Sequence, residues 1–292
     1  MTYLIIANVG DLCAERVRMA PCQRSAEVLV TCDPVAERGV FSWELDTEHS
    51  SSSLTLPDQQ RSICAEALRG VFVRSQGGPE ATQEWTSEDY MYVQAERRAA
   101  LVGWLHNLPC PVVNRLTADL WFRPYRPYAE WQSLLRKSGL PTLRCRITND
   151  FENAVEFARR CGPIAYTPLT SNTRYLVQTD DDWRELEKVL KIFPVCLKQT
   201  VSDPRASAWL VGDIVIWNTD IGLPCSYRLV FERGLRNLAS LLNISTFEIA
   251  VGIGPAGLCC DGIDLYPRLE NYERDGQSSV VGEIVSLIGA AA

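Results

Sequence analysis

The stretch that most constrains the fold of this chain runs from residue 163 to residue 220 and reads as one compact sheet unit. A helix is expected over Trp183–Ile192, because Leu186, Val189 and Leu190 recur there at helical spacing. Apolar runs of strand length lie on both sides of this helix. The expected strands are Ile164–Leu169, Tyr175–Gln178, Val195–Val201 and Ala206–Trp217.

Turn residues set the order of these strands. Gly212-Asp213 predicts a two-residue hairpin within the last strand, because such turns favour residues that adopt a positive φ. Asp203-Pro204 predicts a further turn between the expected strands Val195–Val201 and Ala206–Trp217. The unit therefore reads as strand, loop, strand, helix, strand and hairpin.

The region up to about Val113 alternates strands with helices, which predicts a largely parallel sheet. The serine-rich segment Asp46–Pro57 is expected to be a surface loop. The expected strands are Tyr3–Asn8, Val28–Thr31, Val71–Arg74 and Pro111–Asn114, and the expected helices are Cys13–Met19 and Glu88–Asn107.

The other segments predict a mixed arrangement of helices and strands. Ile221–Glu232 reads as a loop and a strand, and Asp150 is expected to cap a helix that ends at Arg160. The remaining expected helices are Tyr128–Ser138, Arg233–Leu242 and Ser278–Leu287, and the remaining strands are Leu143–Ile147, Thr246–Gly252 and Gly257–Asp264. The fold class is therefore α/β, with α+β character in the C-terminal part.

Composition excludes several classes of function. The net charge of −7 argues against nucleic acid as a general partner, because phosphate binding needs a basic surface. Apolar runs are too short to span a membrane, so a cytoplasmic protein is expected. The 11 cysteines follow no CxxC or Cys/His spacing and read as reduced thiols. His49 and His106, the only histidines, stand in unlike contexts, which argues against a histidine-based metal site.

Three separated segments resemble the ATP-grasp family, and most closely its peptide-modifying branch. They are RPYAEWQSLLRKSGLPTLRCRITND, LKQTVSDPRASAWLVGD and GIDLYPRLENYERDGQSSVVGEIVSLI, in this order. The resemblance covers nearly the whole chain. It implies a parallel-sheet pre-ATP-grasp domain over residues 1–125, a linker helix and small central domain over 126–200, and an antiparallel-sheet domain over 201–292.

The resemblance implies ATP and Mg²⁺ as cofactors, and transfer of the γ-phosphoryl group to a carboxylate. Two basic side chains normally reach the phosphates in this family. The first position falls on Arg126, which keeps the charge, but the second falls on the neutral Thr167, and Arg174 lies in a different register. The hinge that would hold adenine through its backbone falls on Lys198, Gln199, Thr200 and Val201.

The family's catalytic arginine falls on Arg205, for which a solvated turn residue is an equal alternative. The metal-binding Glu-x-Asn positions fall on Gly262 and Asp264, so the glutamate is missing. Glu248 matches the earlier acidic ligand. Asp261 is expected to point to the opposite strand face from Asp264, since side chains alternate along a strand.

These losses favour a catalytically degenerate ATP-grasp protein that binds a peptide, a small carboxylate or an active paralogue. The alternative is an active ligase with a rearranged site, in which arginine and lysine side chains carry the phosphate charge and Asp261 joins Glu248 and Asp264 at the metal. A third reading is an unrelated α/β scaffold. By resemblance, the chain is expected to form a homodimer.

Overall fold

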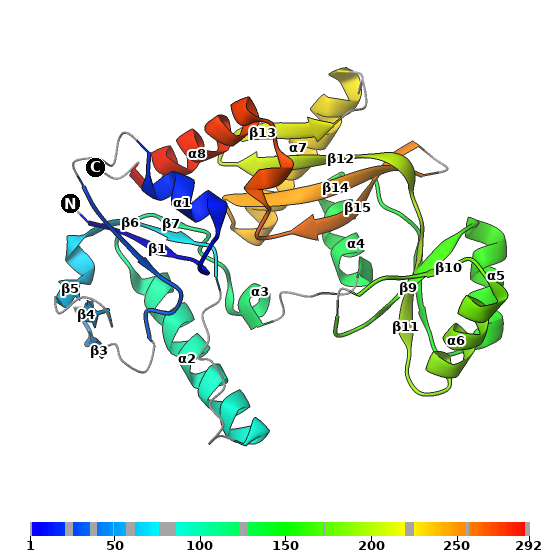
Figure 1. Cartoon of the computed structure of the whole chain (residues 1–292), viewed down its shortest axis with the longest axis horizontal. Coiled ribbons are helices and arrows are strands. Elements are labelled where there is room, and N and C mark those ends of the chain that lie inside the picture. The colour runs from blue at the N-terminus through cyan, green and yellow to red at the C-terminus, as the bar shows by residue number, and fades with distance from the viewer. Residues whose placement is uncertain are drawn as a thin grey trace.

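The computed structural model describes residues 2–20, 26–35, 40–48, 50–56, 62–75, 86–122, 126, 128–171, 173–219, 225–254 and 257–289, with the backbone alone for 202–205 and 219. Figure 1 shows the chain as an elongated molecule with the N-terminal sheet at one end and a smaller lobe at the other. In these ranges no helix has the length and apolar character that a bilayer-spanning segment needs.

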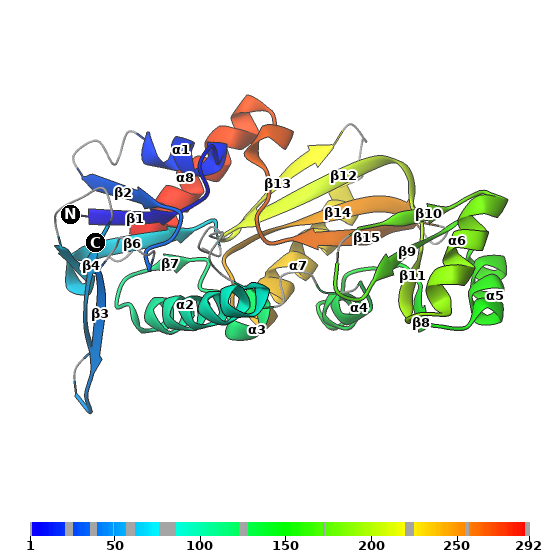
Figure 2. The same ribbon diagram turned by 60° about the horizontal axis from the view of Figure 1, so that its bottom comes forward.

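The N-terminal region forms a parallel sheet with the strand order β2-β1-β6-β7, as the alternation of strands and helices predicts. Its strands are β1 (Thr2–Ile6), β2 (Glu27–Thr31), β6 (Leu68–Val73) and β7 (Val112–Val113). Alternate residues of β1 point to two different cores, because strand side chains alternate. Leu4 packs with α2 (Ser87–Asn107), and Ile5 packs with α1 (Leu12–Arg18) and α8 (Arg274–Gly289). Figure 2 shows α2 on one side of this sheet and α1 and α8 on the other.

The serine-rich segment is a strand, and the expectation of a loop over Asp46–Pro57 is wrong. β4 (Ser50–Thr55) buries Ser52 and Leu54, whose side chains face the same way. The Ser52 hydroxyl accepts a hydrogen bond from the Trp104 indole at 2.8 Å, which replaces the hydrogen bonds to water that the hydroxyl loses on burial. A three-stranded antiparallel sheet results, with β3 (Val40–Leu45), β4 and β5 (Ser62–Cys64), and the short 3₁₀ helix η2 (Ala65–Ala67) follows it.

The small lobe is an antiparallel sheet with the order β10-β9-β11-β8, covered on its outer face by two helices. Its strands are β8 (Cys145–Thr148), β9 (Ile164–Pro168), β10 (Tyr175–Val177) and β11 (Val195–Gln199), and its helices are α5 (Phe151–Cys161) and α6 (Asp180–Leu190). Phe157, Leu186 and Leu197 meet in its separate core. The Asp150 carboxylate accepts from the Asn153 N–H at 2.7 Å, which confirms the expected cap.

The large lobe is an antiparallel sheet with the order β13-β12-β14-β15. β12 (Ser202–Val211) turns into β13 (Ile214–Thr219) at the predicted Gly212-Asp213 hairpin, whereas the backbone at Asp203-Pro204 already belongs to β12. Its other strands are β14 (Thr246–Gly254) and β15 (Gly257–Asp264), its covering helices are α4 (Tyr128–Lys137), α7 (Cys225–Leu242) and α8, and α3 (Ala118–Phe122) and η3 (Leu269–Asn271) are short connections.

Helix α7 begins earlier than the sequence predicts. The strand expected within Ile221–Glu232 is wrong, because residues from Cys225 onward are helical. Phe231, Leu235 and Leu238 are buried at helical spacing against the large sheet, and this packing outweighs the strand preference of the aromatic and β-branched residues before them.

Candidate functional site

The two lobes are joined where β11 leads directly into β12, at Thr200 and Val201. The segment between α4 and β8 also connects them, since Thr142 forms a parallel bridge with Cys260 of β15. The Cys260 N–H donates to the Pro141 carbonyl at 2.9 Å. Side chains of β11 and β15 therefore meet across the junction of the lobes.

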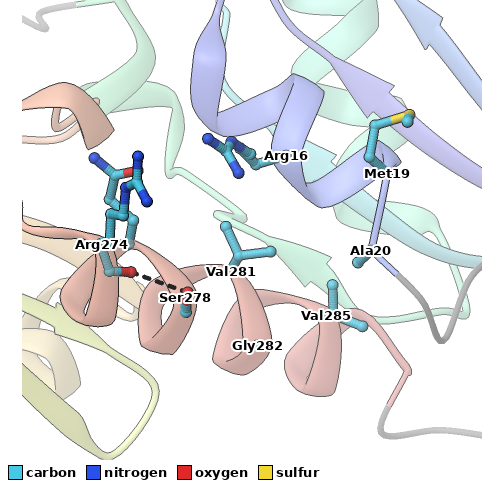
Figure 3. Close-up of a pocket in the computed structure, with 9 residues that line it drawn as sticks. Arg16, Met19, Ala20, Arg274, Ser278, Val281, Gly282 and Val285 are labelled. Atoms are coloured by element: carbon cyan, nitrogen blue, oxygen red, sulfur yellow. Dashed lines mark hydrogen bonds between the residues drawn. The ribbon is translucent and has the colours of Figure 1, made fainter.

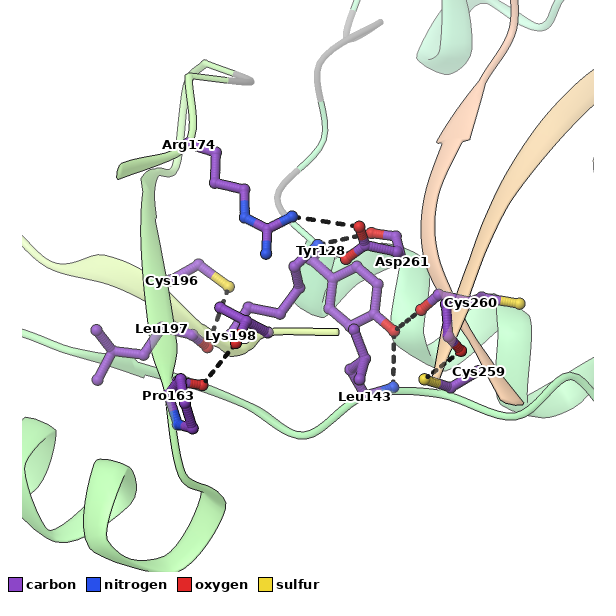
Figure 4. A network of polar contacts seen from close by, with 12 residues as sticks. Tyr128, Leu143, Pro163, Arg174, Cys196, Leu197, Lys198, Cys259, Cys260 and Asp261 are labelled. Carbon is purple, nitrogen blue, oxygen red and sulfur yellow. Dashed lines mark hydrogen bonds and ion pairs between the residues drawn. The ribbon is translucent and has the colours of Figure 1, made fainter. Parts of the chain in front are cut away.

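A cluster of opposite charges, here called the interlobe cluster, lies at this junction and consists of Lys198, Asp261 and Arg174 (Figure 4). Lys198 Nζ, from β11, lies 2.8 Å from Asp261 Oδ1 and donates to the Asp261 carbonyl oxygen at 2.6 Å. Arg174 Nη1, just before β10, contacts Asp261 Oδ2 at 3.2 Å. One carboxylate of the large lobe thus binds two cations of the small lobe.

A tyrosine completes the surroundings of the cluster. The Lys198 ammonium lies 4.6 Å from the centre of the Tyr128 ring, within cation–π range. The Tyr128 hydroxyl donates to the Cys260 carbonyl at 2.7 Å and accepts from the Leu143 N–H at 2.8 Å. Tyr128 therefore fixes the linker to β15 beside the ion pair.

A β-bulge brings Asp261 into this position. Ala250 of β14 pairs with Gly262, but the next residue, Val251, pairs with Cys260, so Asp261 falls between the two registers. A bulge of this kind re-aims the extra side chain. The simple alternation that predicts opposite faces for Asp261 and Asp264 is interrupted here, and the Asp261 carboxylate turns to the cations of the small lobe.

Burial dominates the electrostatics of the cluster. The Lys198 side chain is 11% exposed and that of Asp261 is 7% exposed. Burial lowers the pKa of the Lys198 ammonium, and the Asp261 carboxylate counteracts this shift. Arg174 buries its Nε and Nη2 atoms without a hydrogen-bond partner in the described part of the chain. Of the Arg174 guanidinium, only Nη1 therefore binds Asp261.

The two predicted phosphate positions do not provide free cations. The Arg126 guanidinium pairs with Asp119 of α3 and lies 5.4 Å from the Trp131 ring centre, and its side chain is only 9% exposed. Thr167 is half-buried on β9, opposite Cys196 of β11. Arg126 therefore holds the linker helices together, and Thr167 contributes no charge.

Two of the four predicted hinge residues, Gln199 and Thr200, donate their polar hydrogens to nearby backbone carbonyls. Gln199 donates its backbone N–H to the Arg144 carbonyl at 3.0 Å and its side-chain amide to the Cys161 carbonyl at 2.7 Å. Thr200 donates both its N–H and its hydroxyl to the Pro163 carbonyl. Val201 is buried and packs against Gly252.

The predicted metal ligands Glu248 and Asp264 are brought together as direct cross-strand partners on β14 and β15. Burial raises the pKa of the Glu248 carboxyl, against hydrogen bonds from Ser207 and Tyr272, and the Asp264 charge raises it further. The Tyr272 hydroxyl donates to Glu248 Oε1 at 2.7 Å. Asp264 is exposed and accepts from the Tyr266 N–H at 2.8 Å.

This donor set fits a divalent cation only in part. Oxygen ligands suit Mg²⁺, which demands near-octahedral geometry, but two carboxylates, one of them committed to Tyr272, are a weak set. Among the described residues, no group of three or more Asp, Glu, His or Cys side chains is placed to hold a metal. A Cβ added to Gly262 would meet no atom within 4 Å, so the strand has room for the glutamate that the resemblance expects there.

Three positions remain: the predicted catalytic residue Arg205, and Asp261 and Tyr128, whose roles in the site the sequence did not predict. The side chain of Arg205 lies outside the described residues. Asp261 is the centre of the site, and the isolated Gly262 inside a strand is the signal that could have predicted the bulge. Tyr128 carries no signal of its own, because its contacts with Leu143 and Cys260 depend on tertiary structure.

No protein-family model matches the chain, and no curated protein matches it. Solved structures match it over almost its entire length. The macrocyclase MdnC of Microcystis aeruginosa MRC, bound with precursor peptide MdnA, superposes with a TM-score of 0.79 at 16% identity and covers 100% of both chains. A RiPP-associated ATP-grasp ligase of Chryseobacterium gregarium, in complex with ADP and a leader and core peptide, has a TM-score of 0.76 at 15% identity and covers 100% of this chain and 97% of its own.

The ATP-grasp ligase PsnB, complexed with a minimal precursor, Mg and ADP, has a TM-score of 0.73 at 18% identity, with 99% of this chain and 97% of that chain covered. At these identities the likeness is one of fold. The fold that the resemblance predicts is therefore confirmed over the whole chain.

Proposed function

The chain has the ATP-grasp fold of the peptide-modifying ligases over its full length, and from this premise we propose that it is a peptide-binding protein whose nucleotide site is neutralised by its own carboxylate. It does not transfer phosphoryl groups by itself. Peptides are the preferred ligand class, because the matched structures were solved with precursor peptides.

One observation carries this proposal: Asp261 binds both Lys198 and Arg174 at the junction of the lobes. A triphosphate placed between the lobes would need these cations, and it would also bring its own negative charge close to Asp261. Removing ions from water costs several kcal/mol each unless good partners replace the water. The internal ion pairs supply such partners without a nucleotide.

ATP and Mg²⁺ remain the cofactors to test. When bound, they would supply an activated phosphoryl group and charge neutralisation. Lys198 and Arg174 are the side chains that would hold the phosphates, and Glu248 and Asp264 are those that would hold the metal. Arg205 keeps its proposed role near the phosphates.

Calorimetry with AMPPNP and Mg²⁺ tests the proposal. The wild-type protein is expected to bind AMPPNP only at millimolar concentration, which corresponds to about −4 kcal/mol. Asp261→Asn keeps the side-chain size but releases both cations. It should tighten AMPPNP binding by about tenfold or more and leave adenosine binding unchanged, because adenosine carries no phosphate.

Asp181→Asn is the matched control, since Asp181 pairs with Arg184 on the exposed surface of α6. It should not change AMPPNP affinity. Micromolar binding of AMPPNP by the wild-type protein, or ADP release from ATP in the presence of a peptide substrate, would overturn the proposal.

The second candidate is an active ligase with a rearranged site, and the cross-strand pair Glu248–Asp264 favours it. Under this alternative the wild-type protein releases ADP in the presence of Mg²⁺ and a peptide. Under the first proposal only Asp261→Asn combined with Gly262→Glu gains any ADP release, because both the cations and the missing carboxylate are then restored.

The protein is further proposed to act in the cytoplasm as a homodimer, alone or with an active paralogue that supplies catalysis. Small carboxylates are an alternative ligand class. Light scattering on the purified protein should give twice the mass of one chain.

A further inference from the structure

A pocket of about 540 Å³ lies between α1 and α8 and shares no residue with the interlobe cluster (Figure 3). Its α8 side is one continuous face of the helix, because residues three and four positions apart share a face. This face consists of Arg274, Gln277, Ser278, Val281, Gly282 and Val285. Arg16, Met19 and Ala20 line the opposite side. The volume falls in the range of about 300–1,000 Å³ that is typical of small-molecule sites.

The pocket is polar at one end and apolar at the other. Figure 3 shows the guanidinium groups of Arg16 and Arg274 at one end, while Met19, Ala20 and Val285 lie at the other. From Arg274 to Val285 the helix rises about 16 Å, at about 1.5 Å per residue. An elongated ligand with one charged end would match this gradient.

The cationic end is prepared for an anion. Through their side chains, neither Arg16 nor Arg274 forms an ion pair or hydrogen bond within the ranges that the structure describes. Arg16 and Arg274 are both exposed, and a carboxylate can accept two parallel hydrogen bonds from a guanidinium group. Arg274 is also the first residue of the 16-residue helix α8, where the helix dipole favours negative charge.

The apolar end is kept open by a glycine in the middle of a helix. A Cβ added to Gly282 would meet no atom within 4 Å, whereas one added to Gly276 of the same helix would lie 3.3 Å from Ile216. Close packing therefore explains Gly276 but not Gly282. An interior helical glycine lowers helix stability by about 1 kcal/mol relative to alanine. Gly282 therefore destabilises α8 while it leaves this wall of the pocket without a side chain.

We propose that this pocket binds a medium-chain aliphatic carboxylate. The carboxylate lies between Arg16 and Arg274, and the alkyl chain follows Val281 and Val285 past Gly282 toward Met19. This site is independent of the proposed function at the interlobe cluster.

Calorimetry with octanoate and octanol tests the inference on the full chain. Octanoate should bind saturably, and octanol, which lacks the charge, at least about tenfold more weakly. Arg16→Gln with Arg274→Gln should lower octanoate affinity about tenfold or more and leave octanol affinity unchanged. Gly282→Leu should abolish binding of both ligands, because its side chain fills the apolar end.

Each variant has a matched control. Arg159→Gln with Arg160→Gln removes the same charge from α5 and should leave octanoate binding unchanged. Ser286→Leu adds the same side chain at an exposed position of α8 that does not line the pocket, and it should also leave octanoate binding unchanged. Thermal unfolding confirms that each variant is folded.

Four results would overturn the inference. The first three are the lack of saturable octanoate binding up to about 10 mM, unchanged binding by folded Gly282→Leu, and an equal loss in the α5 control. Tighter binding of N-acetyl-Leu-Val-Leu than of octanoate would assign the pocket to peptide C-termini instead and would also refute it.

Discussion

The charged side chains at the lobe junction are neutralised or hydrogen-bonded by neighbouring residues in the absence of a ligand. Asp261 forms ion pairs with Lys198 and Arg174, whereas Glu248 faces Asp264 and accepts hydrogen bonds from Tyr272 and Ser207. A carboxylate that is buried beside another carboxylate favours its protonated form. Burial thus separates the pKa of the Glu248 carboxyl in the folded protein from its ordinary value.

Glu248→Gln should reveal this difference as a change in the pH dependence of stability. Because the pKa of Glu248 is raised in the folded state, the wild-type carboxyl stabilises the fold most below its ordinary pKa of about 4.5, and this contribution is lost as pH rises through the folded pKa. The variant should thus gain free energy of unfolding relative to wild type from pH 4.5 upward and then level off. Urea unfolding between pH 4 and 8 measures it, with Glu185→Gln as an exposed control. A constant difference across that range would refute the assignment.

Elements were predicted well where a regular pattern extends over many residues. The helix expected over Glu88–Asn107 is α2, and the Gly212-Asp213 hairpin is correct. The serine strand β4 was missed, because its apolar alternation is confined to Leu54 and its neighbours. The bulge at Asp261 was also missed, because Gly262 signals a bulge nearby but the register also depends on the partner strand.

Strand β6 and helix α8 pack so closely that the addition of one methyl group between them should lower stability. A Cβ on Gly70 would lie 2.1 Å from the Ile288 carbonyl oxygen. Gly70→Ala should therefore force β6 and α8 apart and lower the free energy of unfolding by about 2–4 kcal/mol. Gly282→Ala, on the open flank of α8, should raise it by up to about 1 kcal/mol. Urea denaturation compares the two, and a neutral Gly70→Ala would contradict the close packing.

At the scale of the whole molecule, the interlobe cluster acts as a clasp between the two sheets, next to the hinge at Thr200 and Val201. The clasp and the Tyr128 hydroxyl are described contacts that cross from α4 and β11 to β15. Opening of the lobes requires the ion pairs of Asp261 with Lys198 and Arg174 to break, because these pairs join the small lobe to β15. The stability of the clasp therefore sets how often the junction opens.

Asp261→Asn should increase amide hydrogen exchange at this junction. Leu143 and Cys260, whose amides are bonded across the linker, should exchange about tenfold faster, which is about 1.4 kcal/mol, while α5 amides remain unchanged. Mass spectrometry of proteolytic peptides measures it, with Asp181→Asn as control. Equal exchange in wild type and Asp261→Asn would show that the ion pairs do not hold the lobes together.

The position of α8 also bears on synthesis by the ribosome. Ile288 is buried with Ile5 and Phe72, so one face of the first sheet is completed by residues made more than 200 positions later. At about 5–20 residues per second this interval lasts roughly 10–45 s. During that time α1 alone covers this face of the sheet, and the apolar side chains that α8 later buries stay exposed on the nascent chain.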